Sequence, residues 1–278
     1  MFVCLSLIRA LWGRTLVGGG PDSRCLSRRS AGAEGVRGGE ARRARGDAGR
    51  SRAAAGRDGL PAVAAGTRDA EHLDKLIRKC LLDTFRQTDE DFLKKASSQK
   101  PSWKDGSTAT CVLVVDDVLY VANLGDSRAV MCRTEAAPDG PQKLLTLALS
   151  KEHNPTIYEE RMRIQRAGGT VRDGRVLGVL EVSRSIGDGQ YKRCGVISTP
   201  DLRRCQLTAN DRFILLACDG LFKVFSADEA VRFVQNVLQV FSQSGDLRFE
   251  AACQQLASEA VKRGCADNVT VILVSIGC

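Results

Sequence analysis

Residues 212–220 read RFILLACDG, an apolar run that ends in an aspartate and a glycine. An uninterrupted apolar run of this length is typical of a strand that is buried on both faces. Asp219 follows the run directly, and Asp-Gly pairs are common in turns. The run therefore predicts a central strand of a folded domain, with Asp219 at its end.

Further strands are expected upstream of this run. Residues 108–115 and 118–123 are rich in β-branched side chains and flank two acidic residues, which predicts a hairpin. A turn at Gly125-Asp126 then leads into residues 128–133, so we expect a three-stranded antiparallel meander. The last strand of the chain is expected at residues 269–276.

Helical periodicity occupies separate blocks of the sequence. Apolar residues recur at three- and four-residue steps from about Glu71 until Ser97, and Ser226 with Glu229 forms a capping box. Strands and helices in separate blocks favour an α+β domain with sheets packed face to face. The other helices are expected at about residues 156–167, 226–241 and 248–263.

The N-terminal residues differ in composition from the rest of the chain. Residues 1–60 hold 12 arginines and 5 acids, and so carry +7 of the net charge of +8. The remainder is nearly neutral, which argues against a nucleic-acid groove and against nucleic acid as a partner. We expect residues 1–68, rich in Arg, Gly and Ala, to be disordered, and residues 69–278 to form the folded domain.

Few residues in the chain could bind zinc or form a histidine-based triad. It has 11 cysteines without a CxxC pair, and its only histidines are His72 and His153. This cysteine usage favours a reducing, intracellular compartment. No run approaches the roughly 20 apolar residues of a membrane span. Arginines without acids in residues 1–21 leave a mitochondrial presequence as the minority interpretation.

Three aspartates stand at the ends of expected strands. Asp126 lies in NLGDSR, Asp219 in LLACDGL and Asp267 in CADNVTV. Each alone is more readily explained as a turn residue. Together they could converge on a hard cation such as Mg²⁺ or Mn²⁺, which prefers oxygen ligands. An oxygen-only site is therefore the metal site that this chain could build.

The motifs ANLGDSRAV, RVLGVLEVSRSIGD, FILLACDGLF and ADNVTVILV resemble those of the PPM, or protein phosphatase 2C, family. DGSTATCVLVV and KEHNPTIYEERMRIQRAGGTV extend the resemblance, in the family's order, across about residues 71–278. The resemblance implies a four-layer α-β-β-α sandwich with metals at one edge between the sheets. It also implies hydrolysis of phosphoserine and phosphothreonine in proteins, by a water that two Mg²⁺ or Mn²⁺ ions activate.

Site residues follow from the motif match. Asp219 and Asp267 would be ligands of the metal pair, and Asp126 would hold a weaker third ion. In many relatives an aspartate stands three residues after the Asp-Gly pair, but here this residue is Lys223, which disfavours a tight third site. No catalytic residue beyond the metal ligands is implied.

Residues 153–180 match the region that carries the family's substrate-facing flap. Arg172 and Arg175 of this region are candidate substrate-binding residues, although solvated surface charge is the stronger interpretation. Arg184 is expected to brace the fold by hydrogen bonding. No base is placed beside Ser183 by the motifs, so a nucleophile role is rejected.

The family's opening strands are not found in residues 1–70. The arginine strand, the Met-Glu-Asp segment and the Asp-Gly-His-Gly-Gly motif, which supply the phosphate-binding arginine and further metal ligands, have no counterpart there. The expected sandwich therefore lacks its N-terminal strands, and the phosphatase domain is incomplete at its N-terminus. Loss of ligands and of the phosphate clamp predicts impaired activity.

Two interpretations of function remain open. The first is an impaired phosphatase of the 2C type that acts on phosphoproteins. The second is a non-catalytic, truncated phosphatase that retains docking to partners such as integrin-linked kinase or phosphoproteins. A mitochondrial form whose missing strands come from another chain ranks below both. The expected location is cytoplasmic, with the nucleus as a further site.

Overall fold

The computed structural model describes residues 2–9, 23–26, 62–137, 140–240 and 246–276. Contacts divide the chain into two compact units, one of residues 1–28 and 79–278 and one of residues 29–78. The described part of the second unit is the beginning of helix α1 (Ala62–Ser97), where Arg78 Nε donates to Asp74 Oδ2 at 2.8 Å. The remaining elements belong to the first unit.

The first sheet has the strand order β1-β3-β4-β10, with β9 also paired to β3. All of these pairs are antiparallel. The predicted hairpin forms between β3 and β4, where Val115 pairs with Val118. The strands are β1 (Phe2–Arg9), β3 (Gly106–Val115), β4 (Val118–Leu124), β9 (Ile186–Gly187) and β10 (Asp201–Gln206).

The second sheet has the order β2-β12-β11-β5-β6. The RFILLAC run forms β11 at its centre, and the residues from Phe213 to Ala217 are buried, as the sequence predicts. All pairs are antiparallel except that of β2 with β12. The strands are β2 (Ser23–Leu26), β5 (Arg128–Ala137), β6 (Gly140–Ala148), β11 (Asp211–Ala217) and β12 (Val271–Ser275).

The predicted three-stranded meander is wrong, because β5 leaves the sheet that holds β3 and β4. Gly125 and Asp126 carry the chain across to the second sheet, where β5 pairs with β11 and β6. Gly125 has φ of +99°, and a Cβ atom there would lie 2.3 Å from Thr108 Cγ2. This backbone favours glycine. The turn thus joins two sheets, which a turn motif alone does not reveal.

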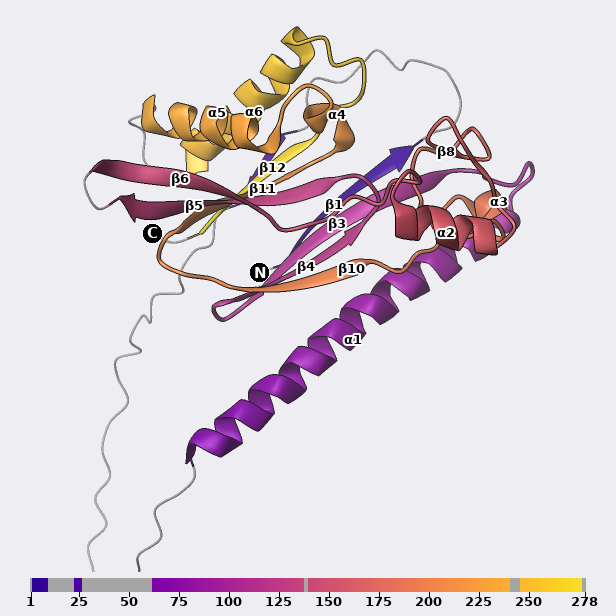
Figure 1. Ribbon diagram of the computed structural model, residues 1–278, viewed down its shortest axis with the longest axis horizontal. Helices are drawn as coiled ribbons and strands as arrows, with labels where there is room; N and C mark the ends of the chain where they lie inside the picture. Colours follow the sequence, from indigo (N-terminus) through magenta and orange to yellow (C-terminus); the bar gives the residue numbers. More distant parts are fainter. Residues whose placement is uncertain (1, 10–22, 27–61, 138–139, 241–245, 277–278) are drawn as a thin grey trace, which may run out of the picture. The chain divides into compact units, whose positions relative to one another are not determined.

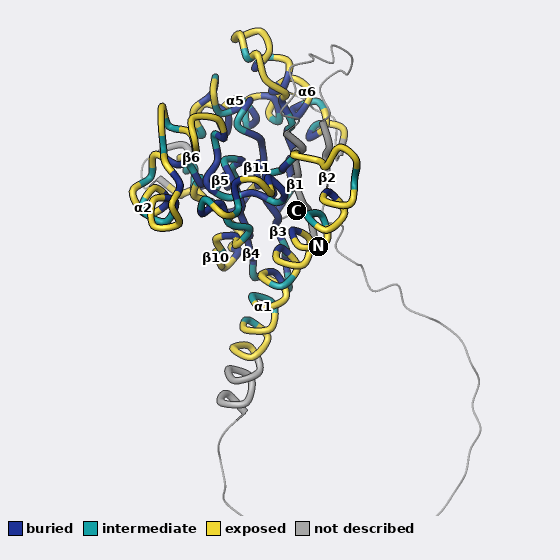
Figure 2. The backbone as a smooth tube through the Cα atoms, turned by 90° about the vertical axis from the view of Figure 1, so that its right-hand side faces the viewer, coloured by how far each residue is buried: buried dark blue, intermediate teal, exposed yellow. Residues whose placement is uncertain are grey.

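The two sheets pack face to face, as expected. Val112 and Leu119 of the first sheet share a buried cluster with Met131, Ile214 and Ile272 of the second. A second cluster joins the opposite face of the second sheet to α5 (Ala227–Val240) and α6 (Asp246–Lys262). Figure 1 shows these two helices on one side of the strands, and Figure 2 shows buried residues concentrated in the strands. The expected α+β sandwich is confirmed.

The three helices expected at about residues 156–167, 226–241 and 248–263 agree with the structure to within a few residues. The capping box is confirmed, because Ser226 Oγ accepts from Glu229 N at 3.2 Å and Ser226 N donates to Glu229 Oε2 at 2.9 Å. No helix in the described part of the chain is long and apolar enough to cross a membrane. The helices are α2 (Tyr158–Arg166), α3 (Gly189–Lys192), α4 (Asp219–Phe222), α5 (Ala227–Val240) and α6 (Asp246–Lys262).

The flap region forms a small substructure with its own core. Strands β7 (Val171–Arg172) and β8 (Arg175–Val176) make a hairpin. Ile164 of α2 packs with Val176, Leu180 and Tyr191 in a buried cluster. This cluster holds the region from α2 to α3 together.

The expectation that residues 1–68 are disordered and contribute no strands is wrong for three segments. Phe2–Arg9 forms β1 along β3, Ser23–Leu26 forms β2 along β12, and α1 begins at Ala62 rather than near Glu71. The first segment pairs with a strand about a hundred residues away in the chain, which local sequence patterns do not reveal. Residues 10–22 and 27–61 lie outside the described residues.

Candidate functional site

Strand register places the three predicted aspartates at one edge of the second sheet. Ala217, the last residue of β11, pairs with Arg128 at the start of β5 and with Val271 at the start of β12. Because these three positions are neighbours, residues just beyond them in the chain emerge at the same edge. The aspartates lie within four residues of them: Asp126, Asp219 and Asp267.

Asp219 and Asp267 both contact one lysine. Lys223 Nζ lies 2.8 Å from Asp219 Oδ2 and 2.6 Å from Asp267 Oδ2. Partial burial lowers the pKa of the Lys223 ammonium, but its hydrogen bonds to the two carboxylates outweigh this and hold the pKa above its ordinary value. The ammonium therefore stays charged and neutralises part of the repulsion between the aspartates.

The backbone around the two aspartates is fixed by close packing. A Cβ atom on Gly220 would lie 2.2 Å from the carbonyl oxygen of Asn268, so only glycine allows this approach. Asn268 N donates to Asp267 Oδ1 at 2.8 Å, and Cys218 Sγ contacts Asn268 O at 3.1 Å. The two carboxylates therefore converge because their chain segments pack together, independently of the flexible Lys223 side chain.

Asp126 and Asp219 line a cleft of about 340 Å³ together with Lys223. The other charged residues that line it include pairs: Arg128 with Glu152, and Arg175 with Glu181. The lining holds five acidic residues and three basic residues, so it favours cations over anions. The cleft thus joins Asp126 to Asp219, whereas Asp267 is not among the residues that line it.

The two candidate substrate-binding arginines are placed differently. Arg175 lines the cleft, pairs with Glu181 and donates to Val179 O at 3.2 Å. Arg172 is exposed on β7 and is not among the residues that line this cleft. A role in substrate binding remains a prediction for both residues.

The described residues do not form a complete metal centre. No group of three or more His, Cys, Asp or Glu side chains in the described ranges is arranged to hold a metal ion. The two converging carboxylates are in contact with an ammonium, which repels a divalent cation. The ligand roles of Asp126, Asp219 and Asp267 therefore remain predictions.

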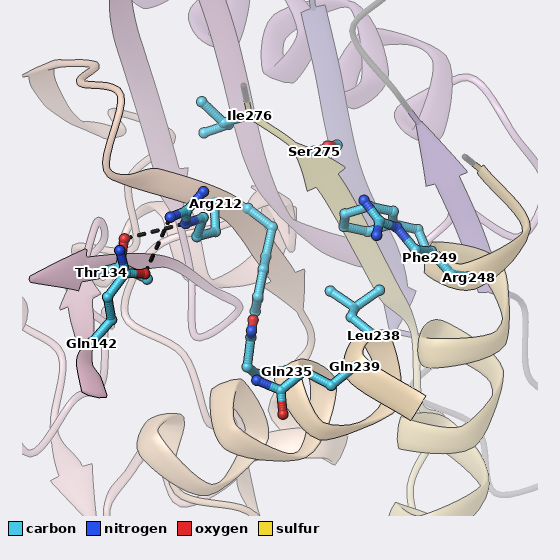
Figure 3. A pocket seen from close by; sticks show the side chains of 11 residues that line it. Thr134, Gln142, Arg212, Gln235, Leu238, Gln239, Arg248, Phe249, Ser275 and Ile276 are labelled. Carbon is cyan, nitrogen blue, oxygen red and sulfur yellow. Dashed lines mark hydrogen bonds between the residues drawn. The ribbon is translucent and has the colours of Figure 1, made fainter. Parts of the chain in front are cut away.

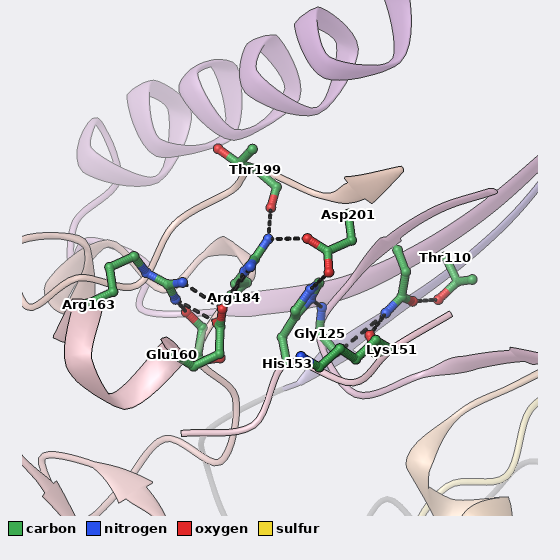
Figure 4. A network of polar contacts seen from close by, with 11 residues as sticks. Thr110, Gly125, Lys151, His153, Glu160, Arg163, Arg184, Thr199 and Asp201 are labelled. Carbon is green, nitrogen blue, oxygen red and sulfur yellow. Dashed lines mark hydrogen bonds and ion pairs between the residues drawn. The ribbon is translucent and has the colours of Figure 1, made fainter. Parts of the chain in front are cut away.

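A second charge cluster lies in the flap region and surrounds the buried Glu160. Arg163 donates to both carboxylate oxygens at 2.7 Å, Arg184 Nη2 donates to Oε1 at 2.7 Å, and Ser183 donates to Oε2. Burial raises the pKa of Glu160, but the hydrogen bonds from Arg163, Arg184 and Ser183 outweigh it and hold the pKa well below its ordinary value. Figure 4 shows Arg163 and Arg184 converging on this carboxylate.

Arg184 has the bracing role that the sequence predicts. Its Nη1 atom donates to Thr199 O at 3.0 Å and to Asp201 Oδ1 at 2.8 Å, so it links α2 to β10 (Figure 4). Ser183 is fully buried against Glu160, which is consistent with the rejection of a nucleophile role. Both residues therefore have a structural role in the fold.

His153 is buried in the same region. Its Nδ1 atom accepts a hydrogen bond from Gly125 N at 3.0 Å. Its Nε2 atom lies 3.2 Å from Asp201 Oδ2 without the alignment of a good hydrogen bond. Burial and the charge of Arg184 lower the pKa of His153, although Asp201 opposes them. The neutral ring thus holds the Gly125 turn that leads to Asp126.

A different pocket, of about 290 Å³, lies where α5 and α6 meet the second sheet. Arg212 there donates to Thr134 Oγ1 at 3.2 Å and to Gln142 Oε1 at 3.4 Å, as Figure 3 shows. None of the predicted site residues lines this pocket. The candidate site is therefore the acidic cleft.

Two features of the site were missed by sequence reasoning. The contact of Lys223 with Asp219 spans four residues of one helical turn, so spacing alone could have indicated it. Its contact with Asp267 joins residues 44 positions apart, and no sequence signal indicates it. Burial of Glu160 was also missed, although Ile164 one turn later marks the same buried face of α2.

The model of the protein phosphatase 2C family matches residues 44–269. This chain belongs to that family, whose members are generally metal-dependent. Among curated proteins, it is 67% identical over 216 residues to the human integrin-linked kinase-associated serine/threonine phosphatase 2C, covering 75% of this chain and 54% of the relative. A probable protein phosphatase 2C 67 from Oryza sativa subsp. japonica is 42% identical over 208 residues, covering 72% of this chain and 55% of the relative.

A serine-threonine phosphatase 2C from Toxoplasma gondii has a similar solved structure. It superimposes with a TM-score of 0.62 at 26% identity, over 78% of this chain and 71% of that chain. A C. elegans sex determining protein gives a TM-score of 0.59 at 26% identity, over 69% of this chain and 45% of that chain. The chain spans about half the length of the curated relatives that it matches.

Proposed function

We propose that this chain hydrolyses phosphoserine and phosphothreonine in proteins, at a rate well below that of complete members of its family. The observation that carries the proposal is the convergence of Asp219 and Asp267 on one cation, at the sheet edge where the family motifs place them. Phosphoproteins are the proposed substrates. Mg²⁺ or Mn²⁺, as a pair with a weaker third ion near Asp126, is the proposed cofactor.

The low rate follows from charge and from the ligands at hand. Two carboxylates that share an ammonium offer a divalent cation little net negative charge. Residues 1–70 do not contain the Asp-Gly-His-Gly-Gly motif that supplies further ligands in the resemblance. Since positioned charge usually contributes the largest share of such a rate enhancement, hydrolysis is expected to be slow.

Hydrolysis of a phosphothreonine peptide, followed as phosphate release with and without Mn²⁺, tests this proposal. Wild-type protein should release phosphate slowly in Mn²⁺, and Asp219→Asn should remove that release because it deletes one of the two converging charges. Asp116→Asn is a matched control, since Asp116 lies in the β3–β4 turn with φ of 50°. Equal rates for wild type and Asp219→Asn would contradict the proposal.

A non-catalytic docking function is the second candidate. Its support is the Glu160 cluster, which holds the flap region together through buried contacts that need no metal ion. Integrin-linked kinase, named in the relative that is 67% identical, is the proposed partner to test first. Retained binding to this kinase by a protein that releases no phosphate would favour docking over catalysis.

A cytoplasmic location, extending to the nucleus, completes the proposal. The cysteine usage of the sequence supports it, because the chain combines an odd number of cysteines with no CxxC pair. Fluorescence microscopy of the full chain with a C-terminal tag tests it. Import into mitochondria would instead support the presequence interpretation of residues 1–21.

A further inference from the structure

Lys223 occupies an unusual position for a surface lysine. It follows α4 directly, and its Nζ atom is within hydrogen-bond distance of Asp219 Oδ2 and Asp267 Oδ2 at once. A single ammonium thus bridges two carboxylates, one from the segment after β11 and one from the segment before β12. Each of these carboxylates is a residue that the family motifs assign to a metal.

We propose that the Lys223 ammonium occupies the cation position between Asp219 and Asp267 and thereby sets the affinity of these two residues for divalent metals. A metal ion that binds the same two Oδ2 atoms must displace the ammonium, because both cations need the space between the carboxylates. The proposal rests on the site assignment made under the proposed function, but it concerns metal binding and does not depend on turnover.

The lysine can leave this position without disturbing the fold. Its side chain is 48% exposed, and its stem is a flexible chain of four methylene groups. The neighbouring Arg128 and Arg175 are paired with Glu152 and Glu181. Displacement of the ammonium into solvent breaks its ion pairs with Asp219 and Asp267.

The carboxylates stay together when the lysine leaves. The close approach of Gly220 to the Asn268 carbonyl, and the hydrogen bond from Asn268 N to Asp267 Oδ1, fix the two segments without Lys223. Removing the ammonium would therefore leave the two carboxylates close together, with Asp219 lining the cleft that also holds Asp126. Such a pair is a better site for Mn²⁺ than the lysine-bound pair.

Binding of Mn²⁺ alone, measured by isothermal titration calorimetry on the full chain, tests this inference. Lys223→Gln removes the charge at similar length, and Lys223→Arg keeps it. Loss of one positive charge at contact distance from a divalent ion should tighten Mn²⁺ binding by about tenfold or more. Lys223→Arg should bind Mn²⁺ as weakly as wild type. The double variant Asp219→Asn with Lys223→Gln should not show this tighter binding of Mn²⁺.

Equal Mn²⁺ affinity in wild type and Lys223→Gln would overturn the inference. Tight binding of Mn²⁺ to the wild type that is abolished in Asp219→Asn would also overturn the inference. This comparison of wild type with Asp219→Asn remains informative even if Lys223→Gln does not fold. Because no phosphopeptide is present, failure of the proposed phosphatase activity leaves this result unaffected. A tenfold gain without any phosphate release would support the inference and contradict only the proposed activity.

Discussion

Two charge clusters of this domain have opposite ratios of carboxylates to positively charged groups. Around Glu160 one carboxylate accepts hydrogen bonds from two guanidinium groups, whereas around Lys223 one ammonium contacts two carboxylates. The Glu160 side chain is 5% exposed, while those of Lys223 and Asp267 are 48% and 43% exposed. The buried cluster holds the fold together, and the exposed cluster can exchange its cation with solvent.

This difference in burial decides how much each cluster contributes to stability. A buried charge that loses its partner cannot be solvated, so breaking such a cluster typically costs about 3–5 kcal/mol. Exposed pairs are screened by water and are typically worth about 0–1 kcal/mol. Substitutions in the two clusters should therefore separate a structural role from a ligand-exchange role.

The largest effect is expected from Glu160→Gln. Removing the carboxylate leaves the guanidinium groups of Arg163 and Arg184 without their common anion, so the free energy of unfolding should fall by about 3–5 kcal/mol. Urea unfolding followed by circular dichroism measures this change. Glu159→Gln, at the exposed neighbouring position, is the matched control and should change it by less than about 0.5 kcal/mol. A similar small loss in both variants would contradict the comparison.

Lowering the pH should gradually remove the contribution of the Glu160 carboxylate to the free energy of unfolding. The folded-state pKa of Glu160 lies below its ordinary value of 4.5, so the stabilisation is complete above about pH 5 and is lost as the pH falls through the folded-state pKa. The difference in unfolding free energy between wild type and Glu160→Gln should therefore be constant near neutrality and shrink below pH 4.5. Urea unfolding of both proteins between pH 7 and the lowest pH at which they fold tests this. A difference that is independent of pH would exclude charge as its cause.

A smaller effect is expected where the backbone brings the exposed carboxylates together. Gly220→Ala places a methyl group against the Asn268 carbonyl, which should cost about 1–3 kcal/mol through overpacking. Gly189→Ala is a suitable control, since its methyl group would meet only the flexible Leu93 side chain at 3.0 Å. Thermal unfolding of both variants measures the difference. Equal melting temperatures would show that the approach of residues 220 and 268 does not constrain this edge.

The smallest effect on stability is expected from Lys223→Gln in chelator-treated buffer. The Lys223 and Asp267 side chains are 48% and 43% exposed and that of Asp219 is 19% exposed, so the free energy of unfolding should change by less than about 1 kcal/mol. Added sodium chloride should reduce even this change, because salt screens exposed charges. A loss as large as that of Glu160→Gln would mean that Lys223 is a structural residue.

Much of the fold could be predicted from local sequence signals. The buried β11 strand, the β3–β4 hairpin and the capping box of α5 depend on residues close together in the chain. Periodicity and turn residues report such features directly. The assignment of β5 to the second sheet depends instead on its pairing with β11, some eighty residues later, and local patterns carry no information on it.

Only part of the candidate site could be predicted, for a similar reason. Strand ends marked Asp126, Asp219 and Asp267, and the strand register confirms that they emerge at one edge. Lys223 was recognised only as a residue that disfavours a third metal ion. Its simultaneous contact with two aspartates depends on how α4 packs beside the segment before β12, which only the three-dimensional structure reveals.

The pairing of β1 with β3 has a consequence for self-association. Every residue from Phe2 to Arg9 pairs along β3, in a register that runs from Leu113 to Gly106. An uncovered strand of this length presents a row of free backbone donors and acceptors to any extended chain that meets it. A chain that began at residue 10 would uncover these backbone groups of β3. In the described part of this chain β1 is the outermost strand of the sheet, so edge-to-edge association on this side must involve β1 itself.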